Sequence, residues 1–234
     1  MPLFAAFGLS EPALVDLTVE DGGVEYASAF AWLLATGLCA QTLWHQLRRP
    51  AARQARWLLV GWMALCFLCM GEEVSWGQRL IGFETPDPIF SQNRQQEVTL
   101  HNLPLFAPEG QSWRDALATG ELNPALLLNI NKLFVLGMLG YFVGLPVLAR
   151  RPRIARLLGR FGYRDMSWAF PAVLSLGLVA SYAVVIGTSL QFTHAVSELR
   201  ELFLALFALT YVAVLTRQST ALAASRVPAL GDRR

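Results

Sequence analysis

The sequence predicts an all-α integral membrane protein, a helical bundle of about five transmembrane helices. Of its 234 residues, 54% are hydrophobic and only 15% are charged, a balance typical of multi-pass membrane proteins. Long apolar segments recur along the chain, and arginines cluster between them. The net charge of +2 is small, so nothing in the composition indicates a nucleic acid partner.

Five apolar segments are the predicted spans, and each is a candidate helix. The second is shorter than the ~20 residues that a spanning helix usually needs. All three cysteines lie in such segments, where they are expected to be small buried thiols. The predicted spans are residues 25–47, 57–73, 125–148, 167–190 and 194–216.

The charges between the spans predict their orientation. Residues 1–47 contain no Lys or Arg, whereas arginines crowd the linkers 48–56 and 149–166 and the tail 217–234. By the positive-inside rule, those three segments are cytoplasmic and the N-terminus is outside. We therefore expect an outer N-terminal segment (1–24), a bundle (25–216) and a cytoplasmic tail, all in the bacterial inner membrane.

Aromatic residues agree with this frame, because Trp44, Trp57 and Trp168 lie beside basic linkers, where an interfacial belt is expected. One long connection, residues 74–124, joins the second and third spans on the outer side. It is expected to hold a helix over 91–102 and a second short helix opened by a capping box at 112–115.

The most unusual feature is a pair of adjacent carboxylates, Glu72 and Glu73, at the end of the second apolar segment. In a helix that rises ~1.5 Å per residue, Glu72 lies ~24 Å from Arg56. The hydrocarbon layer is ~30 Å thick, so the pair is predicted to lie inside the outer leaflet. Ionisable residues at such depth are costly and are functional candidates by default.

Other polar residues are predicted at the same depth. Counted from Arg217, Glu198 lies ~28 Å and Glu201 ~24 Å away, and Lys132 lies ~27 Å from Arg150. Asn131 is at a depth suited to contact a ligand. Three spans far apart in sequence thus contribute to one polar layer.

Helical phase sharpens this prediction. His194, Glu198 and Glu201 fall within ~60° on one helical face, and the loop residues Asn93, Glu97 and His101 are also spaced by four. With Glu72 and Glu73, these residues predict a metal site in which His101, His194 and Glu198 are ligands. Such a mixed imidazole and carboxylate site suits zinc, or iron or manganese. The ion activates water, and Glu72, Glu73 or Glu198 acts in catalysis as acid or base.

Simpler interpretations stand beside this one. The glutamates are also explained as a structural ion-pair network with Lys132, Arg79 and Arg200. His101 is also explained as the end of a loop helix, and His194 as an interfacial residue. No GxSxG motif surrounds Ser75, so the sequence gives little support to a serine hydrolase.

Residues 57–103 resemble a pattern found in uncharacterised bacterial multi-pass membrane proteins. The pattern comprises Glu72-Glu73-Val74-Ser75-Trp76-Gly77-Gln78-Arg79, then Asn93-Arg94-Gln95-Gln96-Glu97 and Leu100-His101-Asn102. The order of the acid pair and the two later histidines is similar to that of the CAAX-protease-like glutamate membrane proteases, in which the arginine stands four residues after the pair and not six. The alkaline ceramidase and adiponectin receptor superfamily is similar in building a zinc hydrolase among seven helices.

Together these features predict a membrane-embedded hydrolase or transferase, with or without a divalent metal, acting on a lipid or lipid-linked substrate. Its site faces outward, with Glu97, Lys132, Glu201, Arg79 and Asn131 in supporting roles. The alternative is a non-enzymatic transporter subunit or assembly partner whose buried charges pair with one another.

Overall fold

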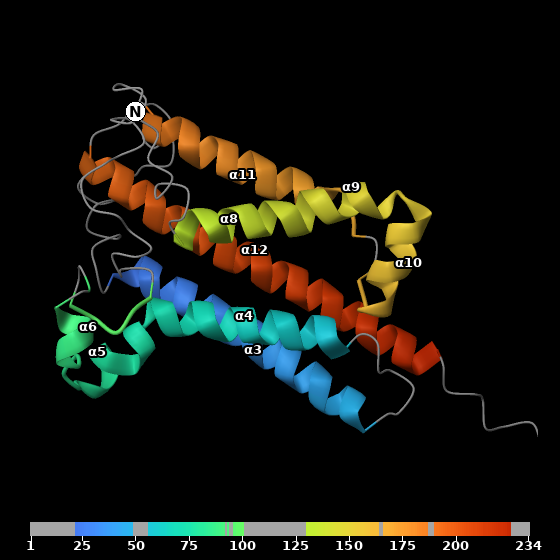
Figure 1. The fold of residues 1–234 in the computed structure, drawn as a ribbon, viewed down its shortest axis with the longest axis horizontal. Helices are drawn as coiled ribbons and strands as arrows, with labels where there is room; N and C mark the ends of the chain where they lie inside the picture. Colours follow the sequence, from blue (N-terminus) through green and yellow to red (C-terminus); the bar gives the residue numbers. More distant parts are fainter. Residues whose placement is uncertain are drawn as a thin grey trace, which may run out of the picture. The chain divides into compact units, whose positions relative to one another are not determined.

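The computed structural model describes residues 22–48, 56–91, 93, 96–100, 130–163, 166–186 and 190–225, with backbone alone at 79–80, 186, 190–194 and 220–225. These residues form helices and turns and no strand, which confirms the all-α class (Figure 1). The helices are α3 (Gly23–Leu47), α4 (Arg56–Glu73), η2 (Ser75–Gly77), α5 (Gln78–Ile81), α6 (Asp87–Phe90), α8 (Ile130–Leu139), η4 (Gly140–Gly144), α9 (Leu145–Ala149), α10 (Pro152–Arg160), α11 (Ala169–Ile186) and α12 (Leu190–Ser225).

Three of the described helical stretches are long and apolar enough to cross a membrane: Gly23–Leu47, Ile130–Ala149 and Ala195–Ser219. A fourth, Ala169–Val185, is apolar but shorter. These helices indicate a membrane protein. Each of the five predicted segments overlaps described helices, whereas the number of spans stays a prediction. The third segment is described from Ile130 and covers α8, η4 and α9, and the last helix runs beyond the predicted boundary at 216 as far as Ser225.

The chain divides into two compact parts, residues 1–70 with 146–234 and residues 71–145. In the first part, α3 packs along α12. The buried face of α3 carries small residues at every third or fourth position, a spacing that lets helices in a membrane approach closely. These are Ser28, Ala31, Ala35, Cys39 and Thr42, beside the larger buried side chains of Trp32 and Leu43, and they face away from exposed residues such as Phe30 and Leu33.

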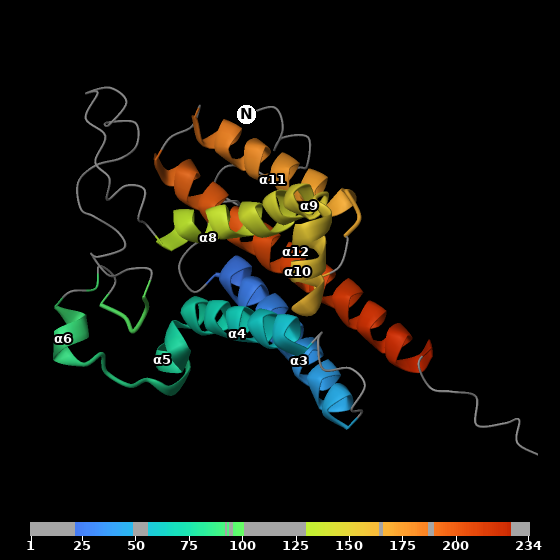
Figure 2. The same ribbon diagram turned by 45° about the vertical axis from the view of Figure 1, so that its right-hand side comes forward.

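Helix α11 also packs against α12, and an aromatic cluster joins the two helices. The Phe170 ring lies 5.7 Å from that of Phe207 and 5.4 Å from that of Tyr211, measured between centroids. Gly177 leaves room for Phe203, since a Cβ there would come within 2.3 Å of its ring. From α4, Trp62 contacts Tyr211 at 5.0 Å. Figure 2 shows the same helices from a second direction.

The predicted basic and aromatic ends are present in the structure. Trp44, Trp57 and Trp168 are all exposed. The guanidinium of Arg48 lies over the ring of Trp44, and that of Arg150 lies over Trp168. At the start of α11, the Ser167 hydroxyl accepts a hydrogen bond from the Ala169 N–H, as expected of a cap.

A π-helical turn, η4, separates α8 from α9, and Pro146 explains where it occurs. Because proline has no N–H, the carbonyl four residues before it loses its helical partner. A wider turn is one way for a helix to absorb such a loss, and π turns are frequent at kinks. The buried Phe142 lies at the centre of this turn.

The predicted helix over 91–102 is wrong. Helix α6 ends at Phe90, and residues 96–98 form bends in which Gln96 has a positive φ of 59°. Sequence spacing alone suggested the helix, but polar contacts described below override it. The short helix predicted at 112–120 lies outside the described residues.

Candidate functional site

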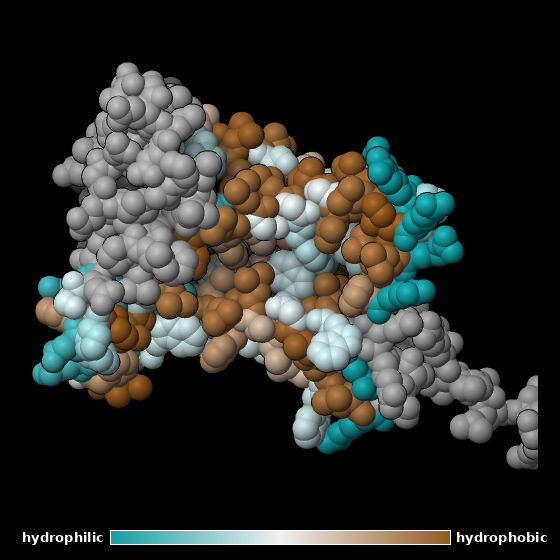
Figure 3. Space-filling view, viewed as in Figure 1, coloured by the Kyte–Doolittle hydropathy of each residue, from teal (hydrophilic) through white to brown (hydrophobic). Residues whose placement is uncertain are grey.

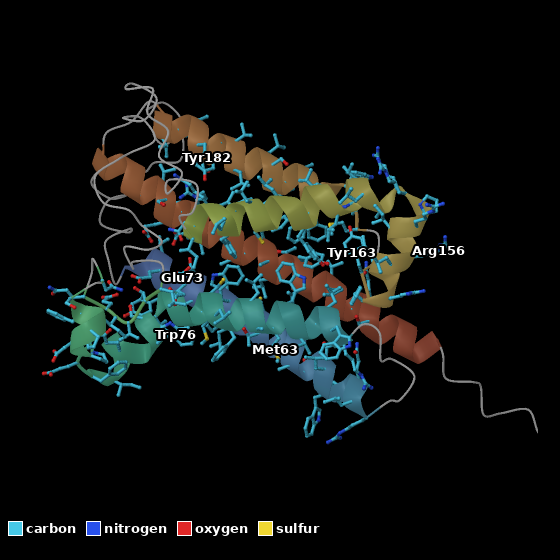
Figure 4. The ribbon with its side chains drawn as sticks, in the orientation of Figure 1. Met63, Glu73, Trp76, Arg156, Tyr163 and Tyr182 are labelled. Carbon is cyan, nitrogen blue, oxygen red and sulfur yellow. The ribbon has the colours of Figure 1, made fainter. Side chains whose placement is uncertain are left out.

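The candidate site is the segment from Gly71 to Leu100, here called the polar loop. It includes the last turn of α4, which ends at Glu73, and the turn that follows with Trp76 (Figure 4). Ser75, Trp76 and Gly77 have successive φ values of 46°, 53° and 81°. For the serine and the tryptophan this left-handed conformation costs ~1–2 kcal/mol each, so surrounding contacts must hold it in place.

The indole of Trp76 folds back over the last turn of α4. A Cβ at Gly71 would lie 2.9 Å from three atoms of that ring, so only glycine fits there. The indole N–H also donates to Glu72 Oε1 at 2.8 Å. Ring contact and hydrogen bond together stabilise the left-handed turn.

The second oxygen of Glu72 reaches across the loop. Glu72 Oε2 accepts a hydrogen bond from the Leu100 N–H at 2.8 Å, although 28 residues separate the two. One half-buried carboxylate therefore binds the turn that follows α4 and the far end of the loop. Hydrogen bonds to a charged acceptor are stronger than neutral ones.

Ser75 and Glu97 form a short hydrogen bond between a hydroxyl and a carboxylate. Ser75 Oγ donates to Glu97 Oε2 at 2.6 Å, and Ser75 is 1% exposed. The Glu97 N–H makes a long 3.5 Å contact with Asn93 Oδ1. A buried hydroxyl that donates to a carboxylate matches the pairing of a nucleophile with its base. The Asn93 contact holds the backbone of Glu97 near this pair.

Further polar residues close the loop. Gln78 Nε2 donates to Thr85 Oγ1 at 2.6 Å, and Gln78 Oε1 accepts from the Val98 N–H at 2.9 Å. Thr85 Oγ1 donates to the Gln96 carbonyl, which helps hold that residue at positive φ. Asn93 Nδ2 donates to the Thr99 carbonyl at 2.9 Å. The polar loop is thus a hydrogen-bonded unit with polar groups in its interior.

The structure brings together some of the predicted site residues. Glu72 and Glu97 belong to the same hydrogen-bonded unit, and Glu73 is the half-buried last residue of α4. Asn131 and Lys132 lie in the first turn of α8, exposed and half-buried respectively. The predicted helical stripe of Asn93, Glu97 and His101 is wrong, because residues 96–100 are not helical.

The remaining predicted residues belong to α12 or lie outside the described side chains. Glu198 and Glu201 are half-buried on one unbroken helix, so the helical phase assumed for them holds. Arg200, on another face, donates to Ser197 Oγ at 2.7 Å and lies over the Tyr182 ring. The side chains of Arg79, His101 and His194 are outside the described set, and their convergence with the acid pair stays a prediction.

The same holds for the predicted metal. Among the side chains that the structure describes, no group of three His, Cys, Asp or Glu residues is placed to hold an ion. Two of the three predicted ligands are the histidines just mentioned. The zinc, iron or manganese site therefore stays a prediction.

Sequence reasoning found little support for a serine hydrolase at Ser75 and did not include Trp76, Gln78 or Thr85 among the site residues. Their roles depend on partners up to 22 residues away, which no local period indicates. The Ser-Trp-Gly tripeptide after a helix end is a signal that could have indicated the left-handed turn, since glycine commonly ends helices in that conformation. No protein-family model, curated protein or solved structure matches the chain.

Proposed function

We propose that this protein is a membrane-embedded hydrolase or transferase that acts on the ester of a lipid or lipid-linked substrate, with Ser75 as nucleophile. The observation that supports it is the 2.6 Å hydrogen bond from Ser75 Oγ to Glu97 Oε2 on a strained left-handed turn. Strained backbone persists only where the surrounding structure holds it, and such positions cluster at functional sites. The long apolar helices support a location in a membrane, where a lipid substrate would be at hand.

In the proposed reaction, Ser75 Oγ attacks the ester carbonyl carbon while its proton passes to Glu97. The leaving alcohol takes that proton as its bond to the acyl carbon breaks, and the acyl group stays on the serine oxygen. Water in a hydrolase, or a second alcohol in a transferase, then attacks the acyl carbon and gives its proton to Glu97. Glu97 passes that proton to the Ser75 oxygen as the acyl–serine bond breaks. Because Ser75 is buried, the loop must open for substrate.

Glu72 takes a positioning role in this proposal, since each of its oxygens already accepts a hydrogen bond. Glu73 and Glu198 remain candidates for acid–base work, and a divalent ion held by His101 and His194 would polarise the carbonyl. We propose five spans with an outer N-terminus and a cytoplasmic C-terminus in the inner membrane, which places the polar loop on the outer side.

The test uses full-length protein in nanodiscs that contain phospholipids with fluorescent acyl chains, and it measures released fatty acid. We expect Ser75→Ala to abolish release and Glu97→Gln, which keeps an acceptor for Ser75, to lower it at least ~100-fold. Ser91→Ala is the matched control, because that serine is exposed directly after α6. Its loss should leave the release of fatty acid unchanged. A fluorophosphonate probe should label Ser75 alone.

Turnover that survives in both Ser75→Ala and Ser75→Gly would overturn the serine mechanism. Metal analysis of the same preparations then tests the metal-dependent mechanism. A stoichiometric ion that is present in the wild type and lost in His194→Ala supports that mechanism. Hydrogen exchange of the loop amides shows whether each variant remains folded.

A specific observation also favours the non-enzymatic alternative. Ser75 and Asn93 are buried, and both Glu72 oxygens are bonded within the loop, as expected of a structural element in a transporter subunit or assembly partner. That function predicts that Glu72→Gln alters transport or complex formation while no lipid is turned over.

A further inference from the structure

Helix α10 has an amphipathic sequence that the proposed reaction does not use. At ~100° per residue, its apolar residues occupy one arc of ~100° and its arginines a separate arc of ~60°. The apolar arc contains Ile154, Leu157 and Leu158, with Phe161 directly after the helix, and the basic arc contains Arg153, Arg156 and Arg160.

The apolar side chains of α10 are open to the surroundings. Leu157 is 52% exposed and Phe161 is 58% exposed. Figure 3 shows hydrophilic residues gathered over the α10 end of the chain, next to a hydrophobic band, and in Figure 4 Arg156 points outward from the helix. A short helix with strong amphipathicity and a basic polar face is typical of helices that lie in a membrane interface.

The ends of α10 hold it close to two apolar helices. Pro152 at its first turn redirects the chain after α9, and Gly162, with a positive φ of 89°, ends it before α11. Arg150 at the end of α9 lies 5.0 Å from the ring centroid of Trp168, just before α11. The end of α9 and the start of α11 therefore lie close together, and both views show α10 at a steep angle to α11, beyond the end of that helix (Figures 1 and 2).

We propose that α10 lies in the headgroup layer of the protein's own bilayer and that its arginines bind anionic phospholipid headgroups. Charge complementarity identifies the partner, since a guanidinium pairs in bidentate fashion with phosphate and Leu157 and Phe161 suit the acyl boundary below. The inference needs α11 to cross the membrane but is independent of the proposed catalysis.

The first experiment measures depth. In full-length protein with Cys39, Cys66 and Cys69 replaced by alanine, a nitroxide is placed at Leu157→Cys or, as matched control, at the exposed Ala155→Cys on the opposite side. In nanodiscs we expect position 157 to be more accessible to oxygen than to a water-soluble nickel chelate, and position 155 to show the reverse. Equal, water-like accessibility at both positions would overturn the placement.

The second experiment measures lipid binding by native mass spectrometry of protein released from nanodiscs of phosphatidylcholine and phosphatidylglycerol in equal amounts. We expect the combined Arg153→Gln, Arg156→Gln and Arg160→Gln variant to lose at least ~10-fold of its retained phosphatidylglycerol, and the matching lysine variant to keep most of it. Unchanged retention in the glutamine variant would refute the proposal. Competition by inorganic phosphate alone would assign the arginines to free anions and overturn the lipid assignment.

Discussion

The core of α3, α11 and α12 and the polar loop are stabilised in opposite ways. The core consists of small residues, such as Ala35 and Gly177, packed together with aromatic side chains, such as Phe207. The loop depends on a few side-chain hydrogen bonds that join residues up to 28 positions apart. Packing is spread over many weak contacts, whereas the loop depends on individual acceptors.

This difference predicts how each region fails. Loss of one core contact lowers the stability of the whole bundle, whereas loss of one loop acceptor opens the loop locally. Regions that open locally are also the ones that ligand-binding sites employ, which agrees with a site in the loop.

Glu72→Ala is expected to have the largest effect, because it removes the acceptor of both the Trp76 and the Leu100 N–H. Leaving these donors unpaired costs about 3 kcal/mol of loop stability. Hydrogen exchange should show faster exchange at loop amides and unchanged protection in α3 and α12. If α12 lost protection equally, the two regions would form one cooperative unit and the comparison would fail.

Gly177→Ala tests how the helical core responds to the disruption of one packing contact. Its new Cβ would lie 2.3 Å from the Phe203 ring, and such overpacking costs about 2 kcal/mol. Thermal unfolding in detergent should show a lower midpoint for the whole protein. The control is Gly37→Ala in α3, where a Cβ meets nothing within 4 Å and the midpoint should not fall.

The helices of the core could be predicted from sequence because their signal is local. Apolar runs predicted the helices, and Trp44 and Trp168 beside arginines predicted the aromatic ends of α3 and α11, whereas the end of α12 lies beyond its predicted boundary. A helical interior needs no knowledge of distant partners, since every backbone bond closes within four residues.

The loop could not be predicted in the same way. The spacing of Asn93 and Glu97 suggested a helix, but a helix cannot place Gln96 at positive φ or bring Glu97 to Ser75. Those contacts depend on how α4 ends, and the reversal at Ser75 is a tertiary effect that propensity does not encode. Glu72 was singled out for the cost of a carboxylate at membrane depth, and its role in a site stays a prediction. Its observed partners are an indole and a backbone amide.

A smaller effect is expected from Gly71→Ala. The added methyl meets the Trp76 ring at 2.9 Å, so the indole must shift and its bond to Glu72 lengthens, at a cost of about 1.5 kcal/mol. Tryptophan fluorescence and loop hydrogen exchange should both change. Gly61→Ala in the same helix meets nothing within 4 Å and is the control; an equal change there would point to a general effect on α4.

The smallest effect separates strain from bonding at Ser75. Ser75→Ala and Ser75→Gly both remove the hydrogen bond to Glu97, but only glycine adopts a φ of 46° without steric cost. The glycine variant should therefore be more stable than the alanine variant by about 1 kcal/mol, as measured by hydrogen exchange of the Leu100 amide. Equal stability would mean that the turn relaxes once the hydroxyl is lost. In that case the link to Glu97 itself imposes the left-handed backbone, and the strain at Ser75 arises from the same contact that we propose activates it.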